Sequence, residues 1–60
     1  MKSPKTENVV VDEVFGLTYV VMAHRILTDG EIFSAIRVEL LKRRGKRPER
    51  GQTLVITTDN

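Results

Sequence analysis

The chain lacks cysteine and tryptophan, and among its 60 residues it has only one histidine, one tyrosine and two phenylalanines. Without cysteine there is no disulfide and no thiolate metal site, and a single histidine would need carboxylates to complete a zinc site. We therefore expect no metal and no cofactor. A chain this short buries only about 60% of the surface that its unfolded form exposes. Association is the remaining way to gain buried area.

Long hydrophobic runs are also missing. No apolar stretch approaches the roughly 18 residues of a membrane-spanning helix, and the first residues, MKSPKTEN, lack the apolar core of a signal peptide. We expect a cytoplasmic protein without a membrane partner. The content of 40% hydrophobic and 30% charged residues is ordinary for a folded chain. The sequence predicts a disordered polar tail over residues 1–7 and a single small domain over residues 8–58.

Three segments have the composition of β-strands. NVVVDEVF (8–15) and LTYVVMAHRIL (17–27) are rich in β-branched residues, and QTLVITT (52–58) has the same character. Gly16 lies between the first two segments, where a tight reversal needs a residue that tolerates positive φ. The pattern predicts a β-hairpin followed, later in the chain, by a third strand.

A helix is predicted between the second and third strands. Thr28-Asp29-Gly30-Glu31 has the S/T-x-x-E form of a capping box, which predicts a helix start at this point. Apolar residues then recur at spacings of three and four, namely Ile32, Phe33, Ile36 and Leu40. Cations in the last turn suit the negative pole of a helix, and Gly45 suits a left-handed cap. We predict a helix over 29–44.

The order strand, strand, helix, strand predicts an α+β fold, a small ββαβ domain in which one helix packs on one face of a three-stranded sheet. We expect a right-handed crossover through the helix, with the third strand beside the first. One alternative stays open. If 17–27 were helical, the chain would read strand, helix, helix, as in ribbon-helix-helix DNA-binding dimers, although Tyr19, Val20 and Val21 are poor helix formers.

Both faces of the predicted sheet carry apolar side chains. Successive residues of a strand alternate between faces, which gives two sets in each of the first two strands: Tyr19, Val21 and Ala23 against Val20, Met22 and Ile26; Val9, Val11 and Phe15 against Val10 and Val14. Strands apolar on both sides are characteristic of sheets with two covered faces. We therefore expect a homodimer or another protein to cover the second face. The alternative is that the valines are exposed singly, as is normal on small sheets.

Little in the chain predicts catalysis. His24 has no second histidine and no cysteine to complete a site, and the adjacent Asp12 and Glu13 point to opposite sides of a strand. No phosphate-binding loop, dinucleotide-binding, hydrolase or zinc-protease motif is present. We expect a protein that is not an enzyme, with no catalytic residue and no small-molecule substrate.

The positive charge is concentrated in one segment. Residues 42–50 carry six cations and one acid, so this segment has a charge of +5 and the rest of the chain −3. Clustered cations neutralise phosphates and release counterions. The predicted nucleic-acid-binding residues are Lys42, Arg43, Arg44, Lys46, Arg47 and Arg50. The expected partner is DNA or RNA, with an acidic protein left open. The alternative function is a homodimeric structural or protein-interaction module whose basic loop is merely solvated.

Overall fold

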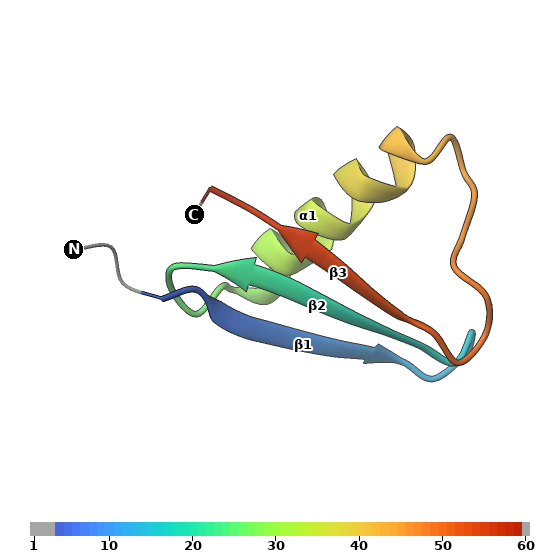
Figure 1. Cartoon of the computed structure of the whole chain (residues 1–60), viewed down its shortest axis with the longest axis horizontal. Helices are drawn as coiled ribbons and strands as arrows, with labels where there is room; N and C mark the ends of the chain where they lie inside the picture. Colours follow the sequence, from blue (N-terminus) through green and yellow to red (C-terminus); the bar gives the residue numbers. More distant parts are fainter. Residues whose placement is uncertain (1–3, 60) are drawn as a thin grey trace.

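The structure, a computed structural model, describes residues 4–59. The chain forms β1 (Thr6–Asp12), β2 (Leu17–Ala23), α1 (Asp29–Lys42) and β3 (Thr53–Thr57), with α1 on one face of a three-stranded sheet (Figure 1). The predicted α+β fold with ββαβ order is confirmed, and the strand at 17–23 rules out the ribbon-helix-helix alternative. In the part of the chain that the structure describes, no helix is long and apolar enough to cross a bilayer.

The strand order is β1-β2-β3, with β1 antiparallel and β3 parallel to β2. The expectation that the third strand lies beside the first is therefore wrong. β2 has more buried residues than β1 or β3, namely Leu17, Tyr19, Val21 and Ala23. The most buried strand is best placed at the centre of the sheet. At the centre, β2 forms backbone hydrogen bonds along both of its edges. This order also places each strand beside its neighbour in sequence.

The strands begin and end at different residues from those predicted. β1 begins at Thr6, and the Lys5 ammonium donates a hydrogen bond of 2.7 Å to the Thr58 carbonyl; residues 1–3 of the predicted tail lie outside the described residues. β1 ends before the turn at 13–16, in which Gly16 has a φ of +63°. β2 ends at Ala23, so Ile26 lies in the connection to α1 and is 81% exposed.

The predicted capping box starts α1 as expected. The Glu31 N–H donates to the Thr28 hydroxyl at 3.3 Å, and the Thr28 N–H donates to the Glu31 carboxylate at 3.0 Å. The helix ends at Lys42, two residues before the predicted end. Arg44 and Gly45 both have positive φ, 55° and 80°, and the left-handed cap predicted at Gly45 is confirmed.

The core lies between α1 and one face of the sheet. It is formed by Leu17, Tyr19, Val21, Ala23, Leu27, Ile32, Leu54 and Ile56. The helix contributes Ile32 fully and Ala35 and Ile36 in part, whereas Phe33 of the predicted apolar stripe is 62% exposed. Val21 is completely buried, and burial of a valine side chain contributes about 1.5–3 kcal/mol.

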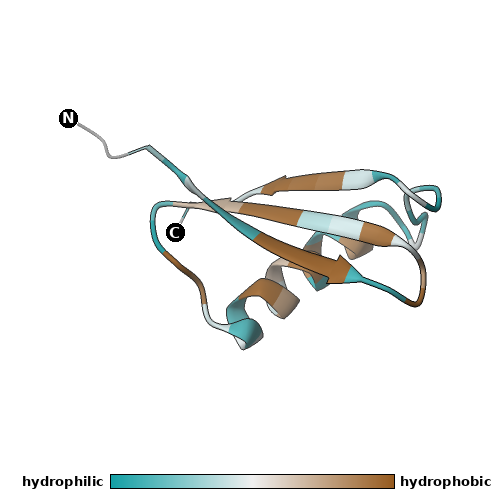
Figure 2. Cartoon of the chain, turned by 90° about the horizontal axis from the view of Figure 1, so that it is seen from below, coloured by the Kyte–Doolittle hydropathy of each residue, from teal (hydrophilic) through white to brown (hydrophobic). Residues whose placement is uncertain are grey.

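No helix or strand among residues 4–59 covers the other face, which we call the open face. The register sets three valines side by side across the sheet, Val9, Val20 and Val55. The rows beside them mix apolar and polar residues: Val11, Thr18 and Thr53; Glu7, Met22 and Thr57. Figure 2 shows hydrophobic segments in all three strands and in parts of α1, of the β1–β2 turn and of the β2–α1 connection. The open face is thus apolar along its middle row.

Candidate nucleic-acid interface

The residues of the predicted interface gather at one end of the molecule. The turn between β1 and β2 and the segment that follows α1 lie at the same end, whereas the β2–α1 connection lies at the other (Figure 1). We call residues 42–50 the basic segment, and its end of the molecule the basic end. All six predicted cations lie on this segment and all are exposed.

The C-terminus of α1 fixes the first part of the basic segment. The Arg44 N–H donates to the Leu41 carbonyl at 3.0 Å, and the Gly45 N–H donates to the Leu40 carbonyl at 3.2 Å. One residue later, the Lys46 N–H donates to the Arg43 carbonyl at 3.1 Å. These bonds satisfy carbonyls that the end of a helix otherwise leaves unpaired.

Arg43 and Glu39 form an ion pair on the surface of α1. The Arg43 Nε lies 3.3 Å from the Glu39 carboxylate, one helical turn away. An exposed pair at this spacing contributes about 0.3–0.5 kcal/mol. The ion pair holds the Arg43 side chain along the helix, and the Glu39 carboxylate partly offsets the positive charge of Arg43.

Arg47 covers an aromatic ring of the hairpin turn. Its guanidinium carbon lies 4.4 Å from the centre of the Phe15 ring, a cation–π distance. Both residues border a recess of about 540 Å³ between α1 and the hairpin. Arg47 therefore ties the basic segment to the turn while it remains exposed to solvent.

Arg50 crosses the hairpin turn at Gly16. A Cβ atom at Gly16 would lie 3.0 Å from the Arg50 Cγ, so the absence of a side chain gives the arginine its place. Next to it, the Gly51 N–H donates to the Gly16 carbonyl at 2.7 Å. The far end of the basic segment is thereby fastened to the turn.

The structure divides the six predicted cations into two groups. Arg43, Arg47 and Arg50 each contact another part of the chain. The side chains of Lys42, Arg44 and Lys46 form no ion pair or hydrogen bond with residues 4–59. The second group is free to meet an external anion, and the first group holds the segment in place.

One further cation at this end was missed by the sequence analysis. Arg37 and Arg47 border the same recess of about 260 Å³, together with Gly45. Arg37 lies on α1, one turn before Leu41, which borders the same recess. It is separated from the basic segment by apolar residues and Glu39 in the sequence, so it reaches this end only through the helical fold.

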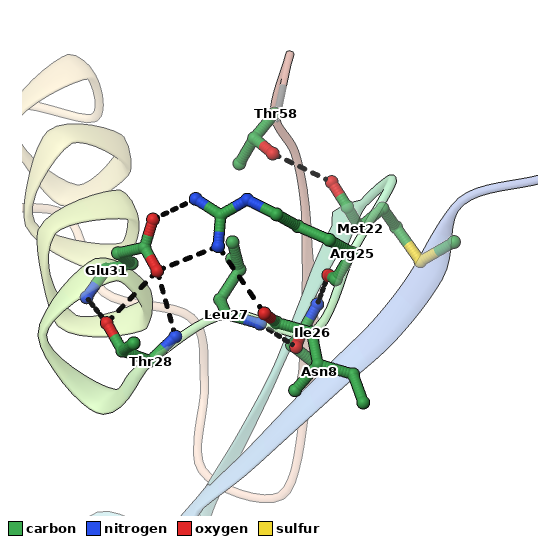
Figure 3. A network of polar contacts seen from close by, with 8 residues as sticks. All are labelled: Asn8, Met22, Arg25, Ile26, Leu27, Thr28, Glu31 and Thr58. Carbon is green, nitrogen blue, oxygen red and sulfur yellow. Dashed lines mark hydrogen bonds and ion pairs between the residues drawn. The ribbon is translucent and has the colours of Figure 1, made fainter.

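The opposite end of the molecule holds a buried polar network, shown in Figure 3. Asn8 is only 6% exposed, and its amide group donates to the Val21 carbonyl at 3.1 Å and to the Arg25 carbonyl at 3.3 Å. Its side-chain oxygen accepts from the Leu27 N–H at 2.9 Å. Asn8 therefore joins β1 to the connection that leads into α1. An asparagine beside a run of valines is the only sequence signal for this role.

The charges beside this network are paired. Arg25 and Glu31 form a two-pronged ion pair, drawn in Figure 3, at the start of α1. The hydrogen bond from Arg25 and then the one from the Thr28 N–H lower the pKa of Glu31 from 4.5 to about 2. The same hydrogen bond raises the pKa of Arg25. We call this end the paired end; among residues 4–59, its Arg25 and Glu31 neutralise each other.

The remaining candidate groups, Asp12 and His24, lie in different parts of the fold. Asp12 accepts hydrogen bonds from the N–H groups of Val14 and Phe15, at 3.1 and 3.3 Å, and so stabilises the hairpin turn. His24 lies exposed in the bend after β2. Within residues 4–59, no group of three or more histidine, aspartate or glutamate residues is placed to hold a metal.

Comparison with protein-family models, with curated proteins and with solved structures finds no match for this chain. Fold alone does not define function, so the function of this chain is inferred from the chemistry of the basic end.

Proposed function

We propose that this chain is a small non-enzymatic binding module of the cytoplasm that binds nucleic acid through its basic end. The observation that carries this proposal is a segment with six exposed cations held at one end by contacts to α1 and the hairpin turn. The hydrogen bonds of the backbone hold the segment in place, so its cations are presented together and little backbone freedom is lost when a polyanion binds.

The type of cation supports phosphate as the target. Four of the six cations are arginines, whose planar guanidinium forms paired hydrogen bonds to phosphate oxygens. Lys42, Arg44 and Lys46 carry the first contacts, because no part of residues 4–59 competes for them. Arg37 extends the same surface along α1.

The test is the salt dependence of binding to a DNA or RNA oligomer of mixed sequence. Each phosphate contact adds about 0.9 to the slope of log affinity against log salt for a duplex. The double variant Arg44→Ala/Lys46→Ala is expected to lower the slope by about 2. Lys5→Ala removes one cation outside the basic segment and is expected to leave it unchanged.

Two results would overturn the proposal. One is absence of binding to either oligomer at about 50 mM salt, where charge-driven affinity is strong. The other is a loss of slope in Lys5→Ala of about 1, half that of the double variant, because an equal loss per charge removed would mean that net charge alone attracts the nucleic acid. Binding to an acidic protein but to neither oligomer would assign the basic end to a protein partner.

The open face supports a second candidate function, a homodimeric structural or protein-interaction module. Val9 and Val55 are 55% and 59% exposed and lie in one row with Val20. Contiguous apolar surface of this kind is characteristic of interaction sites. This function predicts that the wild-type chain has a molar mass above that of the monomer. It also predicts that Val20→Lys lowers the molar mass while its circular dichroism spectrum shows that the fold is retained. A monomer at every concentration would contradict self-association.

A further inference from the structure

β3 is an edge strand of the sheet formed by residues 4–59. Among residues 4–59, β3 pairs only with β2. At one end of this pairing the Thr18 N–H donates to the Gln52 carbonyl at 3.2 Å, and at the other the Thr58 N–H donates to the Met22 carbonyl at 2.9 Å. The even-numbered residues of this segment therefore direct their backbone groups toward β2.

A parallel ladder uses every second residue of a strand, so Leu54 and Ile56 share that orientation. The N–H and C=O groups that point to the outer edge belong to Thr53, Val55 and Thr57. All three residues are exposed. The edge thus presents a row of alternating donors and acceptors to solvent, which is the surface that an additional strand recognises.

The sequence of β3 is close to a palindrome in chemical type. Residues 53–57 read TLVIT, so an antiparallel copy centred on Val55 sets threonine opposite threonine, isoleucine opposite leucine and valine opposite valine. Cross-strand pairs of these types are favourable. The register also keeps the core-facing leucine and isoleucine of both copies on the same side of the sheet.

We propose that a second copy of this chain pairs with β3 in antiparallel orientation, about a two-fold axis at Val55, to form one continuous six-stranded sheet. In this register Val55 faces its own copy, and Thr53 of each chain faces Thr57 of the other. Every outward N–H meets an outward C=O, which gives about six hydrogen bonds between the chains.

The two edges of the sheet differ in their protection against such pairing. β1, the other edge strand, carries Glu7 and Asp12, and Lys5 precedes it. β3 carries no charged residue. Charged residues on an edge strand are a common barrier to edge-to-edge association. The absence of charge directs the pairing to β3 rather than to β1.

The groove beside β3 has room for the second copy. A recess of about 750 Å³ lies between α1 and β3, and small residues of the helix border it, among them Gly30, Ser34 and Ala35. Val38 lies on the same side and is 52% exposed. The two-fold axis brings the recesses of the two copies together above the extended sheet and reduces the exposure of Val38.

The first measurement is the molar mass of the full chain at several concentrations. We expect a monomer–dimer equilibrium. Val55→Pro removes an N–H that points away from β2, and proline is tolerated at such an edge position. We expect this variant to raise the dimer dissociation constant about tenfold or more, with an unchanged circular dichroism spectrum. A wild-type chain that stays monomeric up to about 1 mM would overturn the proposal.

A matched pair of variants separates edge pairing from packing of two open faces. Val9 and Val55 lie in the same row and are almost equally exposed. Val55→Lys sets two like charges opposite each other at the axis and is expected to weaken the dimer, whereas Val9→Lys is expected to leave it intact. Equal weakening by both variants would mean that the open faces pack together, and would exclude the edge dimer.

Cross-linking gives a readout that does not depend on a destabilised variant. Since the chain has no cysteine, Val55→Cys introduces a single thiol per chain. Directly opposite Cβ atoms lie about 4.5–5.5 Å apart, so a short dithiol-reactive cross-linker is expected to join two Val55→Cys chains but not two Val9→Cys chains. Cross-linking of Val9→Cys alone would contradict the proposal.

This inference is independent of the proposed nucleic-acid binding. Val55→Pro tests assembly, and Arg44→Ala/Lys46→Ala tests the basic end. A dimer that binds no nucleic acid would overturn only the proposed function, and a monomer that binds it would overturn only the edge pairing.

Discussion

The two ends of α1 use charge in opposite ways. At the paired end, Arg25 and Glu31 neutralise each other beside the buried amide of Asn8. At the basic end, cations outnumber acids, and Lys42, Arg44 and Lys46 have no partner within residues 4–59. The comparison indicates that charge at one end stabilises the fold and that charge at the other is available for an external ligand.

Among the variants considered, Asn8→Ala at the paired end is expected to cause the largest loss in the free energy of unfolding. The substitution removes the side-chain hydrogen bonds to the Leu27 N–H and to the carbonyls of Val21 and Arg25, and it leaves the buried Leu27 N–H without a partner. A buried polar group without a partner costs about 1–3 kcal/mol, so we expect a loss of about 2–3 kcal/mol in the free energy of unfolding, measured with urea.

The control for Asn8→Ala is Glu7→Ala, at the exposed neighbouring position. It is expected to change the free energy of unfolding by less than about 0.5 kcal/mol. If Asn8→Ala unfolds the chain, circular dichroism records the loss directly. Equal stability of the two variants would contradict the role assigned to the buried amide.

A smaller loss is expected at the basic end, from Gly16→Ala. Gly16 has a φ of +63°, a conformation that costs an L-residue about 1–2 kcal/mol. The new methyl group also meets the Arg50 stem, which is flexible enough to move. We expect a loss of about 1–2 kcal/mol in thermal or urea unfolding. Gly30→Ala, at a helical position with open space around it, is the control and is expected to stabilise the chain.

Arg47→Ala and Lys46→Ala sharpen the comparison between folding and binding. Arg47→Ala removes the contact with Phe15 and is expected to cost about 0.5–1 kcal/mol of stability. Lys46→Ala removes an exposed charge and is expected to leave stability within about 0.5 kcal/mol. Both variants are expected to weaken nucleic-acid binding. If Lys46→Ala destabilised the chain as much as Arg47→Ala, the division into two groups of cations would be wrong.

The smallest effect is a change in the pH dependence of stability. The pKa of Glu31 is lowered in the folded state from 4.5 to about 2, so the unfolded state takes up this proton more readily. The contribution of Glu31 is fully present above about pH 4.5 and is lost as the pH falls toward about 2. Urea unfolding across this range is expected to show a shallower acid loss in Glu31→Gln than in the wild type.

Arg25→Gln tests the cause of that effect, because the hydrogen bond from Arg25 is the largest contribution to the lowered pKa of Glu31. It is expected to flatten the acid loss in the same way as Glu31→Gln. An Arg25→Gln variant with the acid response of the wild type would assign the effect to the capping box instead.

The features predicted correctly from the sequence are local. The capping box joins residues three apart, and Gly16 and Gly45 each need only their own backbone conformation. The basic segment was found because its cations are adjacent in the chain. The sequence did not predict which of these cations contact the rest of the chain and which do not. Arg47, for example, meets Phe15 only after the whole chain has folded.

The strand order required information that a single segment does not contain. Pairing of β3 with β2 rather than with β1 depends on how α1 packs over the sheet, because this packing buries Leu17, Tyr19, Val21 and Ala23 of β2. Asn8 is a comparable case. Its partners lie in β2 and in the connection to α1, so its role appears only when β1 is placed beside them.

The sheet order also determines how the chain folds. β1 and β2 are joined by a turn of four residues, 13–16, whereas β3 reaches β2 only after residues 24–52 have been crossed. Short loops close faster than long ones, so the hairpin is expected to form early, with one side of β2 still vacant. Until β3 docks, this side of β2 exposes the backbone N–H and C=O groups that later pair with β3.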